Sequence, residues 1–435
     1  MDANSRNLHS TPRVDQSAYN YTESQAATTY AGSMAETSNN DQTNVSTYSY
    51  RSNIDAARFL RQAYGRTINA VSDSYFLPSD DDEWNRLDKQ HTAIVLGLGG
   101  LYPEAANVPA ILKSQGGETK RILDLGCGTG VWAVGMAREF PHAQVVGVDL
   151  APVPEVDDLP PNVRFEVDDL NLGLDHHEGQ FDLVHIRLVG SGLKNIRQVM
   201  ADAEKCLKPG GLVLWLDIDY DLYSQTNFVY KPVASELNPS GVWLQRPIYE
   251  MRRSAVLGGS DVHEMEKALD EGLWDSPLLD PATCKTASLY LLIGPWATGG
   301  NPSLDQYMNY VGSLMRQDIM SGHRAIHPLL IRTGWSKETV NEWSDKADKE
   351  MEDCNDKMSL RIRIAWGRRR AAEDQPAPSL PAQTEDTEAQ PRHIYPYMFV
   401  YNTKEEAYAQ ILHRTRDKPT VAPVHPADAR ERSKA

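Results

Sequence analysis

Short apolar runs alternate with amphipathic stretches along the chain from residue 120 onward. Several of these runs have the length of a buried strand, namely residues 122–125, 145–150, 163–167, 181–186 and 212–216. Two of the intervening stretches, residues 131–140 and 193–207, carry apolar side chains at helical spacing. Strands that alternate with helices in this way are typical of a parallel sheet covered by helices on both faces. The pattern therefore predicts an α/β fold with a Rossmann-like, doubly wound sheet.

The rest of the chain departs from this alternation, and its composition divides the sequence into segments. We expect a disordered polar tail (1–55), an N-terminal helical cap (56–115), a ligand-binding core (116–220), a helical acceptor region with a sixth strand (221–370), a flexible acidic, Pro-rich insert (371–392), and a last strand with a tail (393–435). Within the later segments, the pattern predicts helices near 240–275 and 303–365, and strands at 288–293 and 394–401.

Charge and cysteine content narrow the classes of function. The chain has 44 basic and 60 acidic residues, a formal net charge of −16, whereas nucleic acid binding by bulk electrostatics needs clustered positive charge. Its four cysteines lie far apart and form no C-x-x-C pair, so we expect neither a disulfide framework nor a bound metal. No apolar stretch approaches the roughly 20 residues of a membrane helix, and no secretory signal pattern is present. We expect a cytoplasmic protein that binds neither membrane nor nucleic acid.

The most informative segment is the turn after the first apolar run, where residues 121–130 read R-I-L-D-L-G-C-G-T-G. Glycines are needed where a chain turns sharply from strand to helix and a ligand lies against bare backbone. A dinucleotide-binding loop would carry Gly or Ala where this chain has Val131. The strand also ends in Asp124, a carboxylate that suits the ammonium group of S-adenosylmethionine (SAM) and not a pyrophosphate.

Polar side chains also end the next three predicted strands. The second ends in Asp149 and Leu150, about 20 residues past the loop, where a carboxylate can accept both ribose hydroxyls. The third ends in Asp168 and Asp169, which can accept from an adenine amino group, and the fourth ends in Arg187. Singly, each of these residues reads as a helix cap or a solvated loop residue. Their consecutive order instead favours one nucleoside bound across the strand ends.

Two further segments make the sequence recognisable. Residues 75–91 read Y-x-L-P-x-D-x-x-E-x-x-R-L-x-x-Q-H, and residues 207–211 read L-K-P-G-G. With the glycine loop and F-E-V-D-D at 165–169, they resemble the fungal TAM-domain methyltransferases, a group of LaeA-like regulators and of enzymes that methylate natural products. The resemblance covers roughly residues 70–405.

The resemblance implies a class I methyltransferase fold with SAM as the cofactor. Its sheet would have seven strands, mostly parallel, with an antiparallel last strand, and residues 288–293 and 394–401 would be the final two. The cofactor-binding residues that we expect are Tyr75, Asp124, Gly126, Gly128, Thr129, Gly130, Asp149, Leu150, Asp168, Asp169 and Arg187.

Candidate catalytic residues are few, because methyl transfer from a sulfonium needs mainly positioning, plus removal of a proton from some acceptors. We select His91 and His185 as candidate bases over His263, with a structural role as the alternative for each. Asp217 and Asp219 follow the fifth predicted strand, where they either face the acceptor or are solvated.

Three other features are read from residue type. Aromatic candidates for the wall of an apolar acceptor pocket, with ordinary core as the alternative, are Tyr75, Tyr220, Tyr223, Tyr290 and Trp296. The D-H-H-E run at 175–178 has metal-ligand residue types, but we expect it in a surface loop. The arginine-rich segment at 361–370 is interpreted as a solvated helix end, with a nuclear signal or a nucleic-acid patch as the alternative.

Three functions compete for this pattern. The leading one is a SAM-dependent methyltransferase that methylates an oxygen of a small-molecule secondary metabolite in a fungal biosynthetic pathway. The alternative is a LaeA-like nuclear regulator of secondary metabolism that binds regulatory protein partners. An NAD-binding oxidoreductase is the third, and both Val131 and Asp124 disfavour it.

Overall fold

The computed structural model describes residues 58–371 and 395–415, except Tyr64, Asp73, Ser74, Phe76, Gln115, Val156, Thr226, Asn227 and Leu237. These residues belong to one compact unit, residues 45–435. The expected disordered tail and, apart from residue 371, the expected flexible insert lie outside the described residues. Among the described helices, none combines the length and the hydropathy that crossing a bilayer requires.

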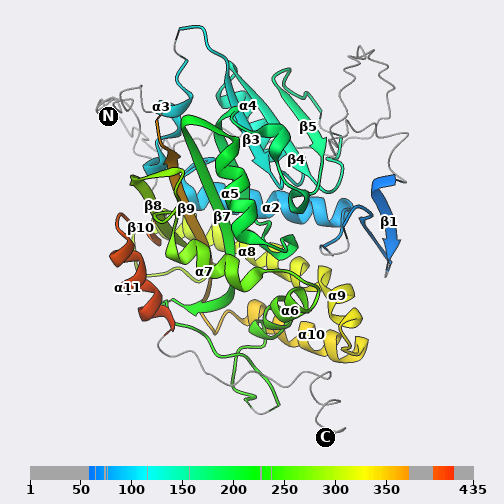
Figure 1. Cartoon of the computed structure of the whole chain (residues 1–435). Helices are drawn as coiled ribbons and strands as arrows, with labels where there is room; N and C mark the ends of the chain where they lie inside the picture. The colour runs from blue at the N-terminus through cyan, green and yellow to red at the C-terminus, as the bar shows by residue number, and fades with distance from the viewer. Residues whose placement is uncertain are drawn as a thin grey trace, which may run out of the picture. The chain divides into compact units, whose positions relative to one another are not determined.

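A single large sheet organises this unit, and its neighbouring strands follow the order β10-β8-β9-β7-β6-β3-β4-β5 (Figure 1). The strands are β3 (Lys120–Leu125), β4 (Ala143–Asp149), β5 (Val163–Val167), β6 (Phe181–Arg187), β7 (Leu207–Ser224), β8 (Leu279–Leu292), β9 (Met358–Arg369) and β10 (Met398–Tyr401). Every neighbouring pair from β7 to β5 is parallel, whereas β9 runs antiparallel to β7 and β8, and β10 to β8. The predicted doubly wound α/β fold is confirmed, but the expected number of strands is wrong, because the described residues form a sheet of eight.

The unexpected strand is β9, which falls in a segment predicted to be helical and then a solvated helix end. Along β9, Ile362 and Ile364 alternate with Arg361 and Arg363, and both arginines pair with Asp219, at 2.8 Å and 3.0 Å. Ion pairing lets these guanidinium groups occupy a central strand, so the arginines concealed a period-two pattern. Arg361 and Arg363 are only 1 % and 5 % exposed, and they therefore cannot form part of a surface nuclear signal.

The two strands expected last in the sequence lie at one edge of the sheet. β8 starts at Leu279 and not at residue 288, while β10 is a four-residue edge strand that starts at Met398 and not at residue 394. Phe399 of β10 lies opposite Ser288 of β8. The antiparallel strand inside the sheet is therefore β9, and β10 is an addition at the edge.

Helices cover both faces of the sheet (Figure 1). One face carries α2 (Asp81–Leu98), α3 (Val108–Leu112), α4 (Val131–Glu139) and α8 (Pro302–Ala325), and the other carries α5 (Ile196–Cys206) and α7 (Val262–Glu271). Ile122 and Leu183 pack in the first apolar layer, and their chain neighbours Leu123 and Val184 pack in the second. Because successive strand residues point to opposite faces, a strand between two apolar layers is apolar throughout.

Further helices and a hairpin extend this core. The helices α6 (Gln245–Leu257), α9 (His327–Arg332) and α10 (Lys337–Asp353) contact one another and form a cap, and α11 (Lys404–Thr415) follows β10. Before α2, the strands β1 (Leu60–Ala63) and β2 (Arg66–Asn69) form an antiparallel hairpin that the expected helical segment did not include. Asp80 caps α2 by accepting a hydrogen bond from the Glu83 N–H at 3.2 Å.

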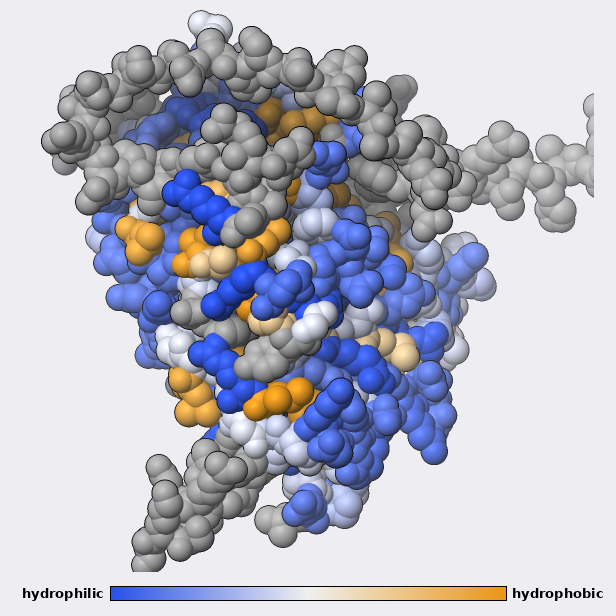
Figure 2. Space-filling model, turned by 90° about the vertical axis from the view of Figure 1, so that its right-hand side faces the viewer, coloured by the Kyte–Doolittle hydropathy of each residue, from blue (hydrophilic) through white to orange (hydrophobic). Residues whose placement is uncertain are grey.

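The surface mixes hydrophilic and hydrophobic residues. On the face shown in Figure 2, hydrophobic residues form small, separate groups between hydrophilic ones. Large exposed apolar side chains are spread over several elements and include Leu159, Leu172, Leu257, Tyr310 and Leu412. Scattered apolar residues of this kind are normal on a folded surface and do not define a partner.

Candidate active site

The glycine loop turns the chain from β3 into α4. Gly126, Gly128 and Gly130 have φ angles of +75°, +56° and +76°, which residues with a side chain rarely adopt. A Cβ atom at Gly126 would lie 2.1 Å from Val189 Cγ1, so the loop also passes too close to its neighbour for a side chain. The Gly128 N–H donates to Asp149 Oδ2 at 2.8 Å and ties the loop to the end of β4.

A first cavity opens beside this loop, at the carboxyl ends of β3, β4, β5 and β6. It encloses about 810 Å³ of empty space, part of it open to solvent. The expected cofactor-binding residues in its wall are Tyr75, Gly126, Gly128, Thr129, Asp149, Leu150, Asp168, Asp169 and Arg187. Parallel strands bring these residues together because their carboxyl ends meet at one edge of the sheet.

Asp149 holds two backbone segments in the wall of this cavity. In addition to Gly128, it accepts a hydrogen bond from the Ala151 N–H at 3.0 Å. Burial raises the pKa of the Asp149 carboxyl, and the two N–H groups oppose that shift. Each carboxylate oxygen keeps a further lone pair, so both can accept from a ligand hydroxyl.

Asp168 and Asp169 are fixed at the end of β5 by backbone hydrogen bonds. Asp168 Oδ1 accepts from the Asp169 N–H at 2.8 Å. Asp169 Oδ1 accepts from the Asn171 N–H at 3.0 Å and thereby caps the short helix η3 (Leu170–Leu172). Both residues are buried and lie in the wall of the first cavity.

Arg187 adds a partly buried positive charge at the end of β6. Its Nη2 donates to His91 Nδ1 at 3.0 Å, and no carboxylate among the described residues lies within ion-pair distance of it. Burial lowers the pKa of Arg187, while the charge of Asp124 opposes this. A cation removed from water without a carboxylate partner is unfavourable, so the first cavity favours a ligand with an anionic group.

The candidate bases are His91 and His185. Neither residue lines the first or the second cavity as the described residues form them. His185 Nδ1 lies 2.7 Å from Asp124 Oδ1, and its ring stacks on Trp132 at 3.7 Å. Burial and the neighbouring Arg187 hold the pKa of His91 well below its usual value, so His91 is a neutral acceptor for Arg187. Both histidines position other residues.

Asp124 and Gly130 are the two expected cofactor residues that the structure does not place in the cavity wall. Asp124 is 2 % exposed and joins β3 to β6 through His185. A Cβ atom at Gly130 would lie 2.6 Å from the Phe165 ring, so this glycine permits close packing beneath the loop.

A second cavity lies next to the first, and Tyr75, Leu87, Gln90 and Leu188 line both. It encloses about 870 Å³, again partly open to solvent. Its lining is mainly apolar and includes Leu77, Ile218, Tyr220, Ile248, Met251, Ile319, Ile326 and Leu360. The cap helix α6 supplies two of these residues, so the cap closes the second cavity over the ends of the strands.

Asp217 is a buried acid in the wall of the second cavity, at 1 % exposure. Its Oδ2 accepts from the Gly190 N–H and its Oδ1 from the Ile218 N–H, both at 2.9 Å. Burial nevertheless raises the pKa of Asp217 to about 6. Asp217 and Asp219 were both candidates to face the acceptor. Asp217 lines the second cavity, whereas Asp219 pairs with the arginines of β9.

The N-terminal motif supplies most of the wall shared by the two cavities. Arg86 pairs with Glu83 of the same helix and with Asp318 of α8, each at 2.6 Å, and the buried pair with Asp318 joins α2 to α8. Leu87 and Gln90, on the next turn of α2, then reach both cavities. Of the aromatic candidates, Tyr75 and Tyr220 line the second cavity, while the core holds Tyr223, Tyr290 and Trp296.

Several residues in the wall of the first cavity were not selected from the sequence. They are Leu87, Gln90, Cys127, Val131, Leu170, Asn171, Leu188, Val189, Gly192 and Leu193. Leu87 and Gln90 belong to the recognised motif, which could have marked them. The others are mostly apolar loop residues, and such residues carry no signal in a single sequence.

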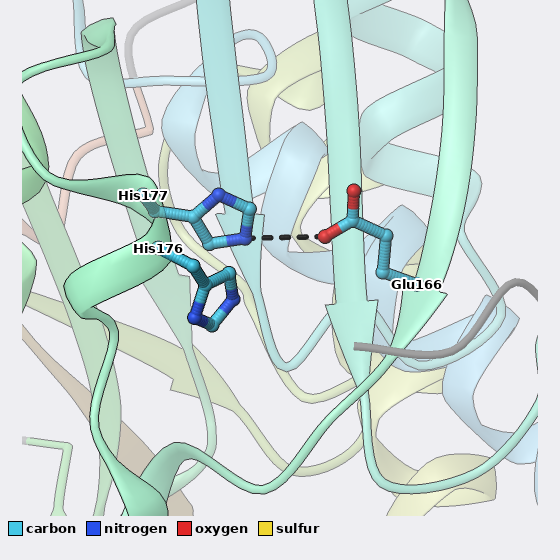
Figure 3. Close-up of side chains that lie close together, drawn as sticks. All are labelled: Glu166, His176 and His177. Carbon is cyan, nitrogen blue, oxygen red and sulfur yellow. Dashed lines mark ion pairs between the residues drawn. The ribbon is translucent and has the colours of Figure 1, made fainter. Parts of the chain in front are cut away.

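The D-H-H-E run was expected in a surface loop, and this is only partly right, because Asp175 and Glu178 are exposed but His177 is buried. His177 belongs to the short helix η4 (Asp175–His177) and is only 4 % exposed. Figure 3 shows its ring directed at the carboxylate of Glu166 on β5, and His177 Nε2 lies 3.1 Å from Glu166 Oε2. Packing of η4 against the edge of the sheet therefore removes this histidine from the surface.

Comparison with known proteins places this geometry in a family. A family model described as a methyltransferase domain matches residues 103–249. The secondary metabolism regulator laeA of Coprinopsis cinerea is 42 % identical over 180 residues, which cover 41 % of this chain and 44 % of that protein. Methyltransferase str2 of Strobilurus tenacellus is 35 % identical over 152 residues, which cover 35 % of this chain and 52 % of that protein.

A third relative aligns over more of its own length. The secondary metabolism regulator LAE1 of Cochliobolus heterostrophus is 30 % identical over 213 residues, which cover 46 % of this chain and 67 % of that protein. The chain spans about half the length of the first two relatives. The strand order, the glycine loop and these alignments agree, and this chain belongs to the LaeA-like class I SAM-dependent methyltransferases.

Proposed function

We propose that this chain binds SAM in the first cavity and transfers its methyl group to a small, largely apolar acceptor in the second. The observation that carries this proposal is the wall shared by the two cavities, to which Tyr75, Leu87, Gln90 and Leu188 contribute. Adjacent cavities allow two bound molecules to meet, and methyl transfer depends mainly on such positioning.

The residues of the first cavity fit SAM on chemical grounds. No described residue supplies a carboxylate partner to Arg187, and the amino-acid end of SAM carries a carboxylate. Asp149 keeps free lone pairs at the end of β4, where ribose hydroxyls bind in folds of this type. Gly126 and Gly128 leave bare backbone where the ligand would approach the loop.

Residues of the first cavity would bind and orient SAM, and a residue of the second cavity would accept the proton of the acceptor. When bound, SAM supplies a methyl group on a positively charged sulfur, which is a good leaving group. Arg187 would orient the carboxylate, Asp149 would hold the ribose, and Asp168 or Asp169 would accept from the adenine amino group. Asp217, whose pKa is raised to about 6, would take the proton of an acceptor hydroxyl as that oxygen is methylated.

The lining of the second cavity supports an apolar acceptor with a polar end. Aliphatic and aromatic side chains dominate the wall, and its acidic and basic residues are Arg86, Asp217, Asp318 and His323. The pattern suits a hydroxylated aromatic or lipophilic small molecule, and it supports the predicted O-methylation of a secondary metabolite.

Isotope transfer tests this function. The purified chain would be incubated with SAM carrying a labelled methyl group and with an extract of small molecules from the source organism. We expect label in one or a few small, lipophilic compounds, and no label in the absence of the chain. Recovery of all label in SAM, with intact SAM binding, would contradict the proposed transfer.

A second candidate is supported by the names of two relatives, which are both regulators of secondary metabolism. In that case the acceptor would be a protein side chain, and the chain would act in the nucleus with protein partners. In the same assay, the label would then enter a protein and not a small molecule. The sequence-based prediction of a cytoplasmic location goes with the small-molecule acceptor, whereas a protein acceptor goes with a nuclear location. Imaging a fluorescent fusion would distinguish the cytoplasmic from the nuclear location.

Substitution of Asp149 tests the ribose contact. Asp149→Ala should weaken binding of S-adenosylhomocysteine by about 1–3 kcal/mol, since charge-assisted hydrogen bonds are lost. Calorimetric titration measures this change. Asp345→Ala, which removes a carboxylate that is 74 % exposed on α10, is the matched control and should bind as the wild type does. An unchanged affinity in Asp149→Ala would mean that the ribose is held elsewhere.

Substitution of Arg187 tests the carboxylate contact. Arg187→Met keeps a long apolar side chain but should cost about 2–4 kcal/mol in S-adenosylhomocysteine affinity, because a buried charge pair is broken. Methylthioadenosine lacks the amino-acid end, and its affinity should therefore change little. An equal loss for both ligands would show that Arg187 supports the cavity without pairing with the carboxylate.

A further inference from the structure

A compact group of metal-binding side chains lies at the edge of the sheet, beside the first cavity. Glu166 comes from β5, and His176 and His177 come from η4. One potential ligand atom from each residue lies within 4.8 Å of the other two. Figure 3 shows both imidazole rings next to the Glu166 carboxylate, and their centroids are 4.1 Å apart.

The facing atoms of this group are buried but do not satisfy one another by hydrogen bonds. Glu166 Oε2, His176 Nε2 and His177 Nε2 are all inaccessible to solvent and have no hydrogen-bond partner among the described residues. His177 Nε2 lies 3.1 Å from Glu166 Oε2, and His176 Nε2 lies 3.3 Å from Asp168 Oδ2, but neither approach meets hydrogen-bond geometry. Buried polar atoms are nearly always paired, and a converging set that is not paired calls for a ligand.

Other atoms of the three residues make further contacts that hold them in place. Arg164 donates to the other oxygen of Glu166, Oε1, at 2.8 Å. Gln180 donates to the His176 carbonyl at 2.6 Å, and the His177 ring packs edge-on against Phe181. The three donor atoms therefore lie close together, with Asp168 Oδ2 beside His176 Nε2, while other atoms of each residue hold it in place.

Two imidazole nitrogens and one carboxylate oxygen match a transition metal and not a hard cation. Ca²⁺ and Mg²⁺ prefer oxygen ligands alone, whereas zinc readily takes a set of two histidines and one glutamate. With zinc–ligand distances of about 2.0–2.2 Å, tetrahedral ligands lie roughly 3.3–3.5 Å apart, so only small side-chain rotations are needed. We propose that Glu166, His176 and His177 bind a zinc ion that joins the end of β5 to η4.

The position of this site gives the ion a structural role. Between its ligands in the sequence lie Asp168, Asp169, Leu170 and Asn171, all of which line the first cavity. A zinc ion would fix both ends of that segment and so order one wall of the cavity. This consequence rests on the proposed binding of SAM, and it predicts tighter cofactor binding when zinc is present. The zinc site itself does not depend on that function.

Titration of the full chain with metal tests the site directly. The chain would be treated with a chelator, dialysed and titrated with Zn²⁺ by calorimetry, and with Co²⁺ to read the ligand set from its visible absorption. We expect one tight ion per chain. His176→Ala should weaken zinc binding by at least roughly 100-fold, since loss of a direct ligand should exceed the 10–100-fold cost of losing an outer partner.

Two other variants keep the test decisive. Glu166→Gln preserves the shape of the carboxylate and should also weaken zinc binding, even if an alanine variant fails to fold. His263→Ala removes a histidine whose side chain is 63 % exposed and should leave zinc binding unchanged. No tight zinc binding, or tight binding that His176→Ala and Glu166→Gln leave intact, would overturn the site.

The same samples separate this proposal from the proposed function. S-adenosylhomocysteine affinity would be compared with and without zinc, and we expect it to be several-fold tighter with the ion. One tight zinc ion with no change in cofactor affinity would overturn the structural role. A zinc-loaded chain that binds no cofactor at all would contradict the proposed function and leave the zinc result standing.

Discussion

Gly128→Arg should abolish cofactor binding while leaving the fold intact. Gly128 lines the first cavity, and a Cβ atom there would meet only Leu87 Cδ1, at 3.6 Å. The backbone therefore accommodates the start of a side chain, but a guanidinium group would occupy the space of the ligand. We expect S-adenosylhomocysteine affinity to fall at least roughly 100-fold, since displaced contacts of about 3 kcal/mol correspond to that factor.

A matched glycine separates this effect from backbone strain. Gly299 also has a positive φ angle, +90°, and is exposed, and no atom of the described part of the chain lies within 4 Å of an added Cβ. Gly299→Arg should bind the cofactor as the wild type does and should show a similar loss of thermal stability. Normal affinity in a folded Gly128→Arg variant would mean that the ligand does not lie against the loop.

Asp217→Asn should lower the rate of methyl transfer to a hydroxyl acceptor by about 10²–10⁴-fold, the usual contribution of a general base. Asp217 lies in the wall of the second cavity only, so S-adenosylhomocysteine affinity should remain unchanged. Single-turnover rates together with calorimetry would measure the two quantities. A variant with full activity would exclude Asp217 as the base.

The pH dependence gives an independent readout of the same residue. Burial raises the pKa of Asp217 to about 6, so wild-type activity should rise as pH increases through that value and the carboxyl loses its proton. The activity of the Asp217→Asn variant should not show this rise with pH. For stability the sign is opposite: the folded pKa exceeds the unfolded value of about 3.8, so Asp217 should reduce the free energy of unfolding as pH rises from about 4 to 6.

The parallel half of the sheet could be predicted because its strands are short apolar runs between two apolar layers. β9 could not, because its arginines are buried against Asp219 and carboxylates of α7, and such pairing is visible only after folding. Its sequence contains four arginines, at positions 361, 363, 368 and 369, and therefore resembles a solvated segment. A single sequence does not reveal which distant acids will neutralise those charges.

The first cavity could be predicted for a related reason. Its polar residues stand at strand ends, where topology alone brings them together, as for Asp149 and Arg187. The second cavity draws residues from α2, α6 and α8, whose packing no local pattern specifies. His91 and His185 had suitable chemistry, but both side chains point behind the first cavity and contact Arg187 and Asp124.

A crystal structure of the chain with S-adenosylhomocysteine would test the central claim most directly, namely that one nucleoside lies across the ends of β3 to β6. We predict its ribose on Asp149, its adenine beside Asp168 and Asp169, and its carboxylate on Arg187. Density for the ligand at another site, or a first cavity filled by side chains in a chain that still binds the ligand, would contradict the account.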